Sequence, residues 1–384
     1  MLRAAKEFKI GRPQVFAGLM LLAFLAQCLW SASSRHLSEL EYQYIASGFS
    51  LENPSLAADR GLGSPMTAWI AGWPVRLSRV MRSVTPASLG ASLAIPRPWF
   101  LRLPFVVFGV WLGGAVWWVA RRLFDDAGGY VALALYCSSP AMVMISSNVG
   151  PEIILAWSSF GLIYTAIGVA HTLYAPPHKW APRVVILGLS VGFALATAWW
   201  SFVLVLLAFA FMIYLAPGRR HAALLVLLGA SVIALAVAGF VTWATGSAGL
   251  DPPGLLSPRP TIALLHNAGF ALNRDTDGYV LIGLFIAALA TWGSWRRARY
   301  FGNTAPLLTA FATVLLFTLV PSLRIWDAVL GLSFLFLFIG GVAADLLETS
   351  RGRLVAAALT AGILLRLVLG LRTVWIYWVG QNPV

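Results

Sequence analysis

The apolar residues of this chain stand in blocks of about 20, each long enough to cross a bilayer as a helix, separated by short stretches rich in Arg, Pro and Gly. The alternating ten-residue segments of an outer-membrane barrel are not visible. With 59% apolar and 11% charged residues, a chain of 384 residues holds too little polar material to cover a water-soluble fold. We predict an all-α, polytopic transmembrane helical bundle that forms a single transmembrane domain over residues 1–384.

Eleven segments are candidate spans by length and hydropathy. They cover roughly residues 14–32, 100–120, 128–146, 150–171, 183–198, 199–216, 222–244, 278–295, 304–321, 326–344 and 353–371. The first one also resembles a signal peptide, with small residues near Ala32 as a cleavage site. We interpret it as an uncleaved anchor, because it is long for a signal sequence and more spans follow.

Alternating these spans across the bilayer places fifteen of the 27 Lys and Arg residues on one face. They are Arg3, Lys6, Lys9, Arg12, Arg121, Arg122, Lys179, Arg183, Arg219, Arg220, Arg296, Arg297, Arg299, Arg351 and Arg353. The positive-inside rule makes this face cytoplasmic, which predicts a multi-pass protein of the cytoplasmic (inner) membrane with its N-terminus inside. The net charge of +13 then reflects topology, and no nucleic-acid partner is expected.

The opposite face receives the long loops 33–99 and 245–277 and the turn 147–150. Since long loops on a rigid scaffold tend to carry function, we expect the chemistry to be extracytoplasmic. The motifs GxGxxG, the Walker loop and HExxH, which are typical of nucleotide-binding proteins and metalloproteases, do not occur. Both cysteines lie in apolar blocks, so the sequence predicts no metal or other cofactor, although a divalent metal stays open.

The first outer loop begins with a segment that contains Glu39 and Glu41. Ser38 followed three residues later by Glu41 matches a capping box, which predicts a helix at the membrane surface and gives Glu41 a structural role. Glu39 would point about 200° away around this helix, held ionised by the helix dipole, as a candidate general base. The alternative is that both are solvated loop charges. Later in the loop, Arg76, Arg79 and Arg82 recur every three residues and predict an amphipathic interfacial helix.

An ordered set of landmarks runs along the first 200 residues or so. It consists of Glu39-Leu40-Glu41-Tyr42-Gln43-Tyr44, Arg102-Leu103-Pro104, Arg121-Arg122-Leu123-Phe124, Pro140 and Pro151-Glu152. This order resembles the GT-C superfamily of membrane glycosyltransferases, in the branch of the protein O-mannosyltransferases, the aminoarabinose transferase of lipid A and the RgtA-like enzymes. The family motif has the form DExxY. Aligning Glu41 and Tyr44 with it puts Leu40 in place of the aspartate, so either Glu39 takes the base role or the chain is a divergent or inactive member.

The resemblance implies a hexosyl- or pentosyltransferase that moves a sugar from a polyprenyl-phosphate donor to an extracytoplasmic lipid, glycan or protein. Glu39 or Glu41 would be the catalytic base, and cationic groups would hold the departing lipid phosphate. The candidate substrate-binding residues are Tyr44, Arg102, Glu152, His266, Arg274, Arg324 and Arg366.

Three of these residues have alternative interpretations. Glu152 could orient the acceptor, bind a metal or cap its own helix. Arg366 lies within a span, where an arginine faces a cavity or a partner unless it snorkels outward. His266 belongs to an interfacial helix or to a lid over the lipid head group.

Two other classes of function compete with the enzyme. A lipid or solute transporter or flippase would need polar residues at mid-depth in several spans, and the spans contain almost none apart from Arg366. An inactive scaffold subunit fits the missing aspartate. The sequence leaves the sugar, the acceptor and the oligomeric state open.

Overall fold

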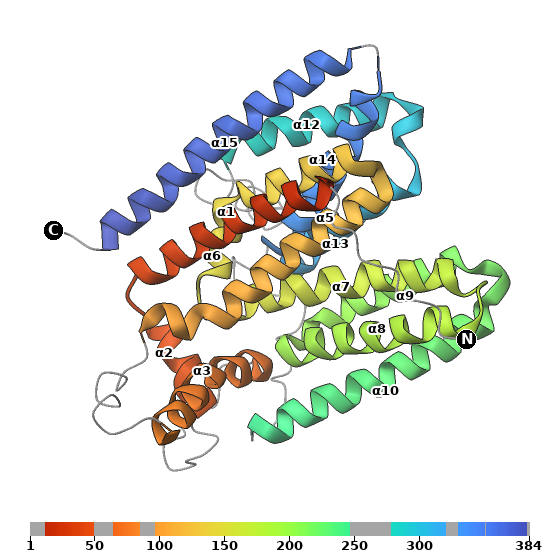
Figure 1. Ribbon diagram of the computed structural model, residues 1–384. Helices are drawn as coiled ribbons and strands as arrows, with labels where there is room; N and C mark the ends of the chain where they lie inside the picture. The colour runs from red at the N-terminus through yellow and green to blue at the C-terminus, as the bar shows by residue number, and fades with distance from the viewer. Residues whose placement is uncertain are drawn as a thin grey trace.

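The structure is a computed structural model that describes residues 12–49, 64–84, 97–245, 278–319, 329–349 and 351–381. Throughout these ranges the regular elements are helices, which lie side by side as an elongated bundle (Figure 1). The all-α fold class predicted from the sequence is confirmed. Helix α15 lies on the opposite side of the bundle from α10 (Figure 1).

Each of the eleven predicted spans overlaps a helix. The helices are α1 (Arg12–Ser34), α2 (Glu39–Phe49), α3 (Pro65–Val84), α5 (Pro98–Cys137), α6 (Pro140–Ser146), α7 (Pro151–Thr172), α8 (Pro177–Thr197), α9 (Phe202–Leu215), α10 (Arg220–Thr245), α12 (Gly278–Ser294), α13 (Phe301–Leu319), α14 (Leu330–Leu347) and α15 (Gly352–Gln381). Seven helices in the described ranges are long and apolar enough to cross a membrane, and three apolar helices are shorter. The count of eleven spans stays a prediction.

Helix α5 is 40 residues long but not continuous. Its backbone leaves helical geometry at Phe124 and Asp125, and Asp125 has a φ of 60°. Two predicted spans, 100–120 and 128–146, therefore fall on either side of this break. The second one is interrupted again at Ser138–Ser139, after which Pro140 opens α6 and the Ser139 hydroxyl accepts a hydrogen bond from the amide of Met142 (3.3 Å).

The core lies along α14 and α7, whose apolar side chains are buried on almost every face. Helix α15 lies at the edge, and most of its residues from Gly352 to Thr373 are exposed. The turn before α13 and the turn after α14 are joined by an ion pair between Arg297 and Glu348 (3.0 Å). Both turns belong to the face that the charge distribution predicts to be cytoplasmic.

Helices α2 and α3 confirm that the first loop contains two helices, which pack against each other at one end of the bundle (Figure 1). Their backbones meet at Gly48 and Gly72, where a Cβ atom on either residue would collide with the backbone of the other. Arg76 of α3 donates a hydrogen bond to the carbonyl oxygen of Gly48 (3.3 Å). Trp73 and Val80 are exposed on α3, as expected for a helix that lies in the membrane interface.

Candidate functional site

Arg102 lies at the centre of a buried junction between the end of α1, the start of α2 and the first turns of α5. Only 1% of its surface is exposed. Its Nε and Nη2 donate to the two carboxylate oxygens of Glu41 at 2.8 and 2.7 Å. Its remaining N–H groups donate to the carbonyl oxygens of Ala32, Arg35 and His36, each at 2.8 Å. All five guanidinium donors are therefore satisfied within the protein.

The carboxylate oxygens of Glu41 also have all their hydrogen-bond partners within the protein. It is 4% exposed, and besides Arg102 it accepts hydrogen bonds from the amides of Ser38 (2.8 Å) and Val149 (3.0 Å). The amide of Glu41 in turn donates to the Ser38 hydroxyl (3.3 Å), which confirms the capping box. Burial alone would raise the pKa of Glu41, but the hydrogen bonds and charge of Arg102 and the two amide donors hold this pKa below its ordinary value. An ionised carboxylate with both oxygens occupied is a poor proton acceptor, so Glu41 fits a structural role.

The hydrogen bond from Val149 to Glu41 brings the turn before α7 against the first loop. Glu152 stands three residues further on, in the first turn of α7, and its side chain folds back toward Gly150. This position at its own helix N-terminus fits the capping interpretation, with a favourable charge-dipole interaction. The first loop and the start of α7 thus meet at one place.

Glu39 is the first residue of α2 and is exposed. Within the described ranges no hydrogen bond or ion pair involves its carboxylate. Of Glu39 and Glu41, Glu39 is therefore the one with a carboxylate open to a substrate.

Arg35 is a buried cation that the sequence analysis did not single out. It is 9% exposed and donates to the carbonyl oxygen (3.2 Å) and hydroxyl (2.8 Å) of Ser31 and to the hydroxyl of Ser147 (2.6 Å). The two hydroxyls are 3.0 Å apart, and we call this arrangement the Arg35 triangle. In the part of the chain that is described, no carboxylate forms an ion pair with Arg35. Burial and the nearby charge of Arg102 lower the pKa of Arg35 to about 10, so it stays protonated at neutral pH.

A signal for Arg35 was present in the sequence. It directly follows the first predicted span, on the face opposite to the fifteen Lys and Arg residues that are predicted to be cytoplasmic. The buried side chains of the junction, Arg35, Arg102 and Glu41, carry one surplus positive charge, and Glu39 and Glu152 lie at its edge. Such a site favours an anion.

The other sequence-predicted residues divide into two groups. Tyr44 is buried in the core, and Arg366 is buried where α5 ends. Arg366 donates to the carbonyl oxygen of Leu135 and to the hydroxyl of Ser138 (3.3 Å), and its guanidinium lies 5.0 Å from the centre of the Phe336 ring. A cation at a helix C-terminus is a stabilising arrangement, which gives Arg366 a structural explanation. The second group, which lies outside the described residues, is His266, Arg274 and Arg324.

Among the described residues, no group of three or more His, Cys, Asp and Glu side chains could hold a metal ion.

The chain is similar to known proteins both in sequence and in fold. Residues 86–243, less than half of the chain, match the family model described as dolichyl-phosphate-mannose-protein mannosyltransferase. The fold is similar to that of ArnT from Cupriavidus metallidurans in the apo state, with a TM-score of 0.62 at 14% identity over 97% of this chain and 75% of ArnT. No curated protein matches the chain in sequence.

Two further solved structures share the fold. ArnT bound to undecaprenyl phosphate gives a TM-score of 0.56 at 17% identity over 96% of this chain and 75% of ArnT. The apo oligosaccharyltransferase of Archaeoglobus fulgidus gives 0.53 at 14% identity over 98% of this chain and 56% of that protein. The chain is an integral multi-pass membrane protein with the GT-C fold, and the resemblance predicted from the sequence is confirmed.

Proposed function

We propose that this protein is a glycosyltransferase that moves a hexosyl or pentosyl group from a polyprenyl-phosphate donor to an extracytoplasmic lipid, glycan or protein. Its active site lies at the outer face of the inner membrane, with the N-terminus in the cytoplasm. The match to a mannosyltransferase family model and the GT-C fold support this class of reaction. The donor class is supported by two relatives, ArnT bound to undecaprenyl phosphate and the archaeal oligosaccharyltransferase AglB in complex with an inhibitory peptide and a dolichol-phosphate.

One observation carries the proposal. An exposed carboxylate, Glu39, begins a helix whose third residue, Glu41, is locked into a buried junction of net positive charge. A transfer from a lipid phosphate needs these two elements, namely a proton acceptor near the attacking hydroxyl and a cation near the departing phosphate. The rigid Glu41–Arg102 pair fixes their relative positions.

In this reaction Glu39 takes the proton from the acceptor hydroxyl as the hydroxyl oxygen attacks the anomeric carbon of the sugar. The bond between that carbon and the phosphate oxygen breaks, and its electron pair leaves with the polyprenyl phosphate. Arg35 stabilises the charge that develops on the phosphate. Arg102 and Glu41 act as positioning residues, because their own hydrogen-bonding groups are already occupied. Glu152, His266, Arg274 and Arg324 remain candidates for acceptor or donor contacts.

The test uses purified protein, a labelled polyprenyl-phosphate sugar and membrane extract as the source of acceptor. We expect Glu39→Gln to lower transfer by about 10²-fold or more, the usual contribution of a general base, without changing the unfolding temperature. Glu348→Gln is the matched control, since Glu348 is also an exposed glutamate and pairs with Arg297 far from the first loop. Unchanged transfer in Glu39→Gln would exclude Glu39 as the base. A wild-type protein that folds and binds the donor but never transfers sugar would indicate the inactive scaffold instead.

A further inference from the structure

Helix α15 is fixed to the rest of the bundle along its C-terminal half. Arg366 reaches the end of α5, and the backbone of Gly370 packs against Pro140 at the start of α6. The indole ring of Trp375 stacks on Trp30 of α1, with the ring centres 6.2 Å apart. These contacts hold the C-terminal half of α15 against α1, α5 and α6, whereas its N-terminal half lies further from α1 and α5.

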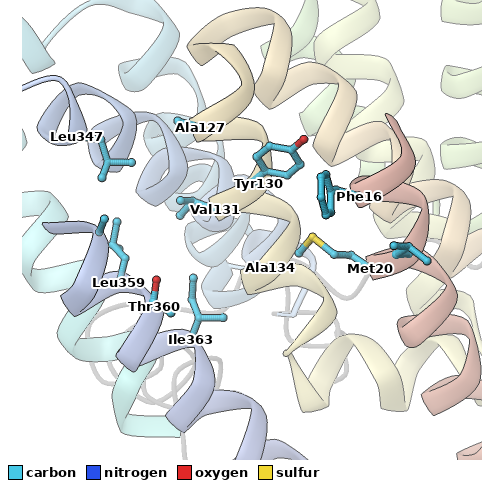
Figure 2. A pocket seen from close by; sticks show the side chains of 12 residues that line it. Phe16, Met20, Ala127, Tyr130, Val131, Ala134, Leu347, Leu359, Thr360 and Ile363 are labelled. Carbon is cyan, nitrogen blue, oxygen red and sulfur yellow. The ribbon is translucent and has the colours of Figure 1, made fainter. Parts of the chain in front are cut away.

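Along its N-terminal half, α15 stands away from α1 and α5 and leaves a cavity of about 520 Å³. Figure 2 shows Phe16 and Tyr130 on one side of the cavity and Leu359, Thr360 and Ile363 of α15 on the other. Apart from the hydroxyls of Tyr130 and Thr360, the lining is apolar. The volume is in the range of natural ligand sites, and the cavity opens to the outside of the bundle.

The depth of this cavity follows from its lining. Phe16 belongs to the second turn of α1, Leu347 is the last residue of α14, and Ala356 belongs to the second turn of α15. The cavity therefore lies near the turn between α14 and α15, on the side that the basic residues predict to be cytoplasmic. In the membrane, its surroundings are lipid tails.

Two arginines stand at the same end of α15. Arg353 precedes Ala356 and Thr360 by three and seven residues, so it lies on the helix face that lines the cavity, one turn closer to the aqueous surface. Arg351 lies in the preceding turn. Both are exposed, and neither forms an ion pair with any residue that the structure describes. Two cations without an ion-pair partner among the described residues thus stand within about a turn of the apolar lining, on its predicted cytoplasmic side.

These features point to a specific ligand chemistry. An apolar cavity by itself does not prefer one lipid over another, because lipid tails are as apolar as the side chains that line it. Cations next to the cavity, on the side of the aqueous surface, add a preference for a negatively charged head group. We propose that this cavity binds an acyl chain of an anionic phospholipid whose phosphate contacts Arg353 and Arg351. The bound chain fills the space that α15 leaves open. This site is separate from the junction around Arg102, and its test does not depend on the proposed transfer reaction.

The experiment measures lipid retention by native mass spectrometry of the purified full-length protein. The probes are phosphatidylglycerol, which is anionic, and phosphatidylethanolamine of the same acyl composition. We expect the wild type to retain phosphatidylglycerol about tenfold better, and the double substitution Arg351→Gln and Arg353→Gln to remove this preference. These residues are exposed, so the variant keeps its fold. Ala356→Phe, which fills the cavity, is expected to lower retention of both lipids.

The control variant is Arg220→Gln. Arg220 is an exposed arginine on the predicted cytoplasmic side that begins α10, and α10 lies away from α15 (Figure 1). Equal loss of the preference in Arg220→Gln and in the double variant would overturn the proposal, because the effect would then be one of general charge. Undecaprenyl phosphate is added as a competitor in a third arm. Its displacement of phosphatidylglycerol at equal concentration would assign the cavity to the polyprenyl carrier and refute the phospholipid.

Discussion

Two buried arginines at the same junction have different partners. Arg102 uses all five donors and pairs with a carboxylate, whereas Arg35 in the Arg35 triangle contacts a carbonyl oxygen and two hydroxyls. Removing one member of a buried ion pair leaves the other uncompensated, so Arg102 and Glu41 should determine stability. A buried cation without a carboxylate partner has charge available for a ligand, so Arg35 should determine binding. The four experiments below test this division, beginning with the largest expected effect.

The largest effect on stability is expected from Arg102→Met, which leaves the buried Glu41 carboxylate without its cationic partner. Breaking a buried pair costs about 3–5 kcal/mol, so the unfolding temperature in detergent should fall sharply. Glu41→Leu combined with Arg102→Met should be more stable than Arg102→Met alone, because removing both charges avoids the stranded one. A double variant no more stable than the single one would show that the pair itself is not the source of the effect.

Arg35→Gln should affect donor binding more than stability. We expect transfer from the labelled polyprenyl-phosphate sugar to fall by about 10²-fold, the size of effect seen when one group that stabilises a developing anion is removed. The KM for the donor should rise, and Arg35→Lys should recover part of the activity because it keeps the charge. A fall in unfolding temperature as large as that of Arg102→Met would contradict the division.

Acidification should weaken the Glu41–Arg102 pair. The pKa of Glu41 is lowered in the folded protein, so the pair contributes stability above the ordinary value near 4.5 and loses it as the pH falls through the lowered value. The unfolding temperature of the wild type should therefore decline in this acidic range. Glu41→Gln should start lower and decline less. Parallel pH profiles for the two proteins would disprove the contribution of this carboxylate.

The smallest effect is expected from Ser147→Ala. This change removes one hydrogen-bond acceptor of Arg35 and should lower stability by about 1 kcal/mol, the usual contribution of a hydrogen bond. Donor binding should change by less than in Arg35→Gln, since the charge remains. Ser190→Ala is a useful comparison, because Ser190 is buried in α8, remote from the junction in sequence. Equal effects on donor KM in both variants would remove Ser147 from the site.

Much of the fold was predictable because the deciding signals are local. Apolar block length predicted where the long apolar helices lie, and Ser38 with Glu41 predicted the start of α2 from two residues three apart. Partners distant in sequence were not predictable. Arg102 and Glu41 are 61 residues apart, and nothing in either local pattern indicates that they meet. Arg102 was expected to hold a phosphate, but its donors are used by the fold.

Arg366 shows a second limit of prediction from the sequence. The segment 128–146 is uniformly apolar apart from small polar residues, so it predicted one unbroken span. The interruption at Ser138 creates free carbonyl groups that a single-span prediction does not contain, and Arg366 binds at that interruption. His266, Arg274 and Arg324 lie outside the described residues, and their roles stay predictions.

The contact between Gly48 and Gly72 has a consequence for chemistry. Any added methyl group at either position would force α2 to tilt away from α3. Since Glu39 sits at the far end of α2, a small change of angle there would displace its carboxylate relative to a bound sugar. The close contact of Gly48 and Gly72, which have no side chains, thus determines where the carboxylate of the proposed base lies.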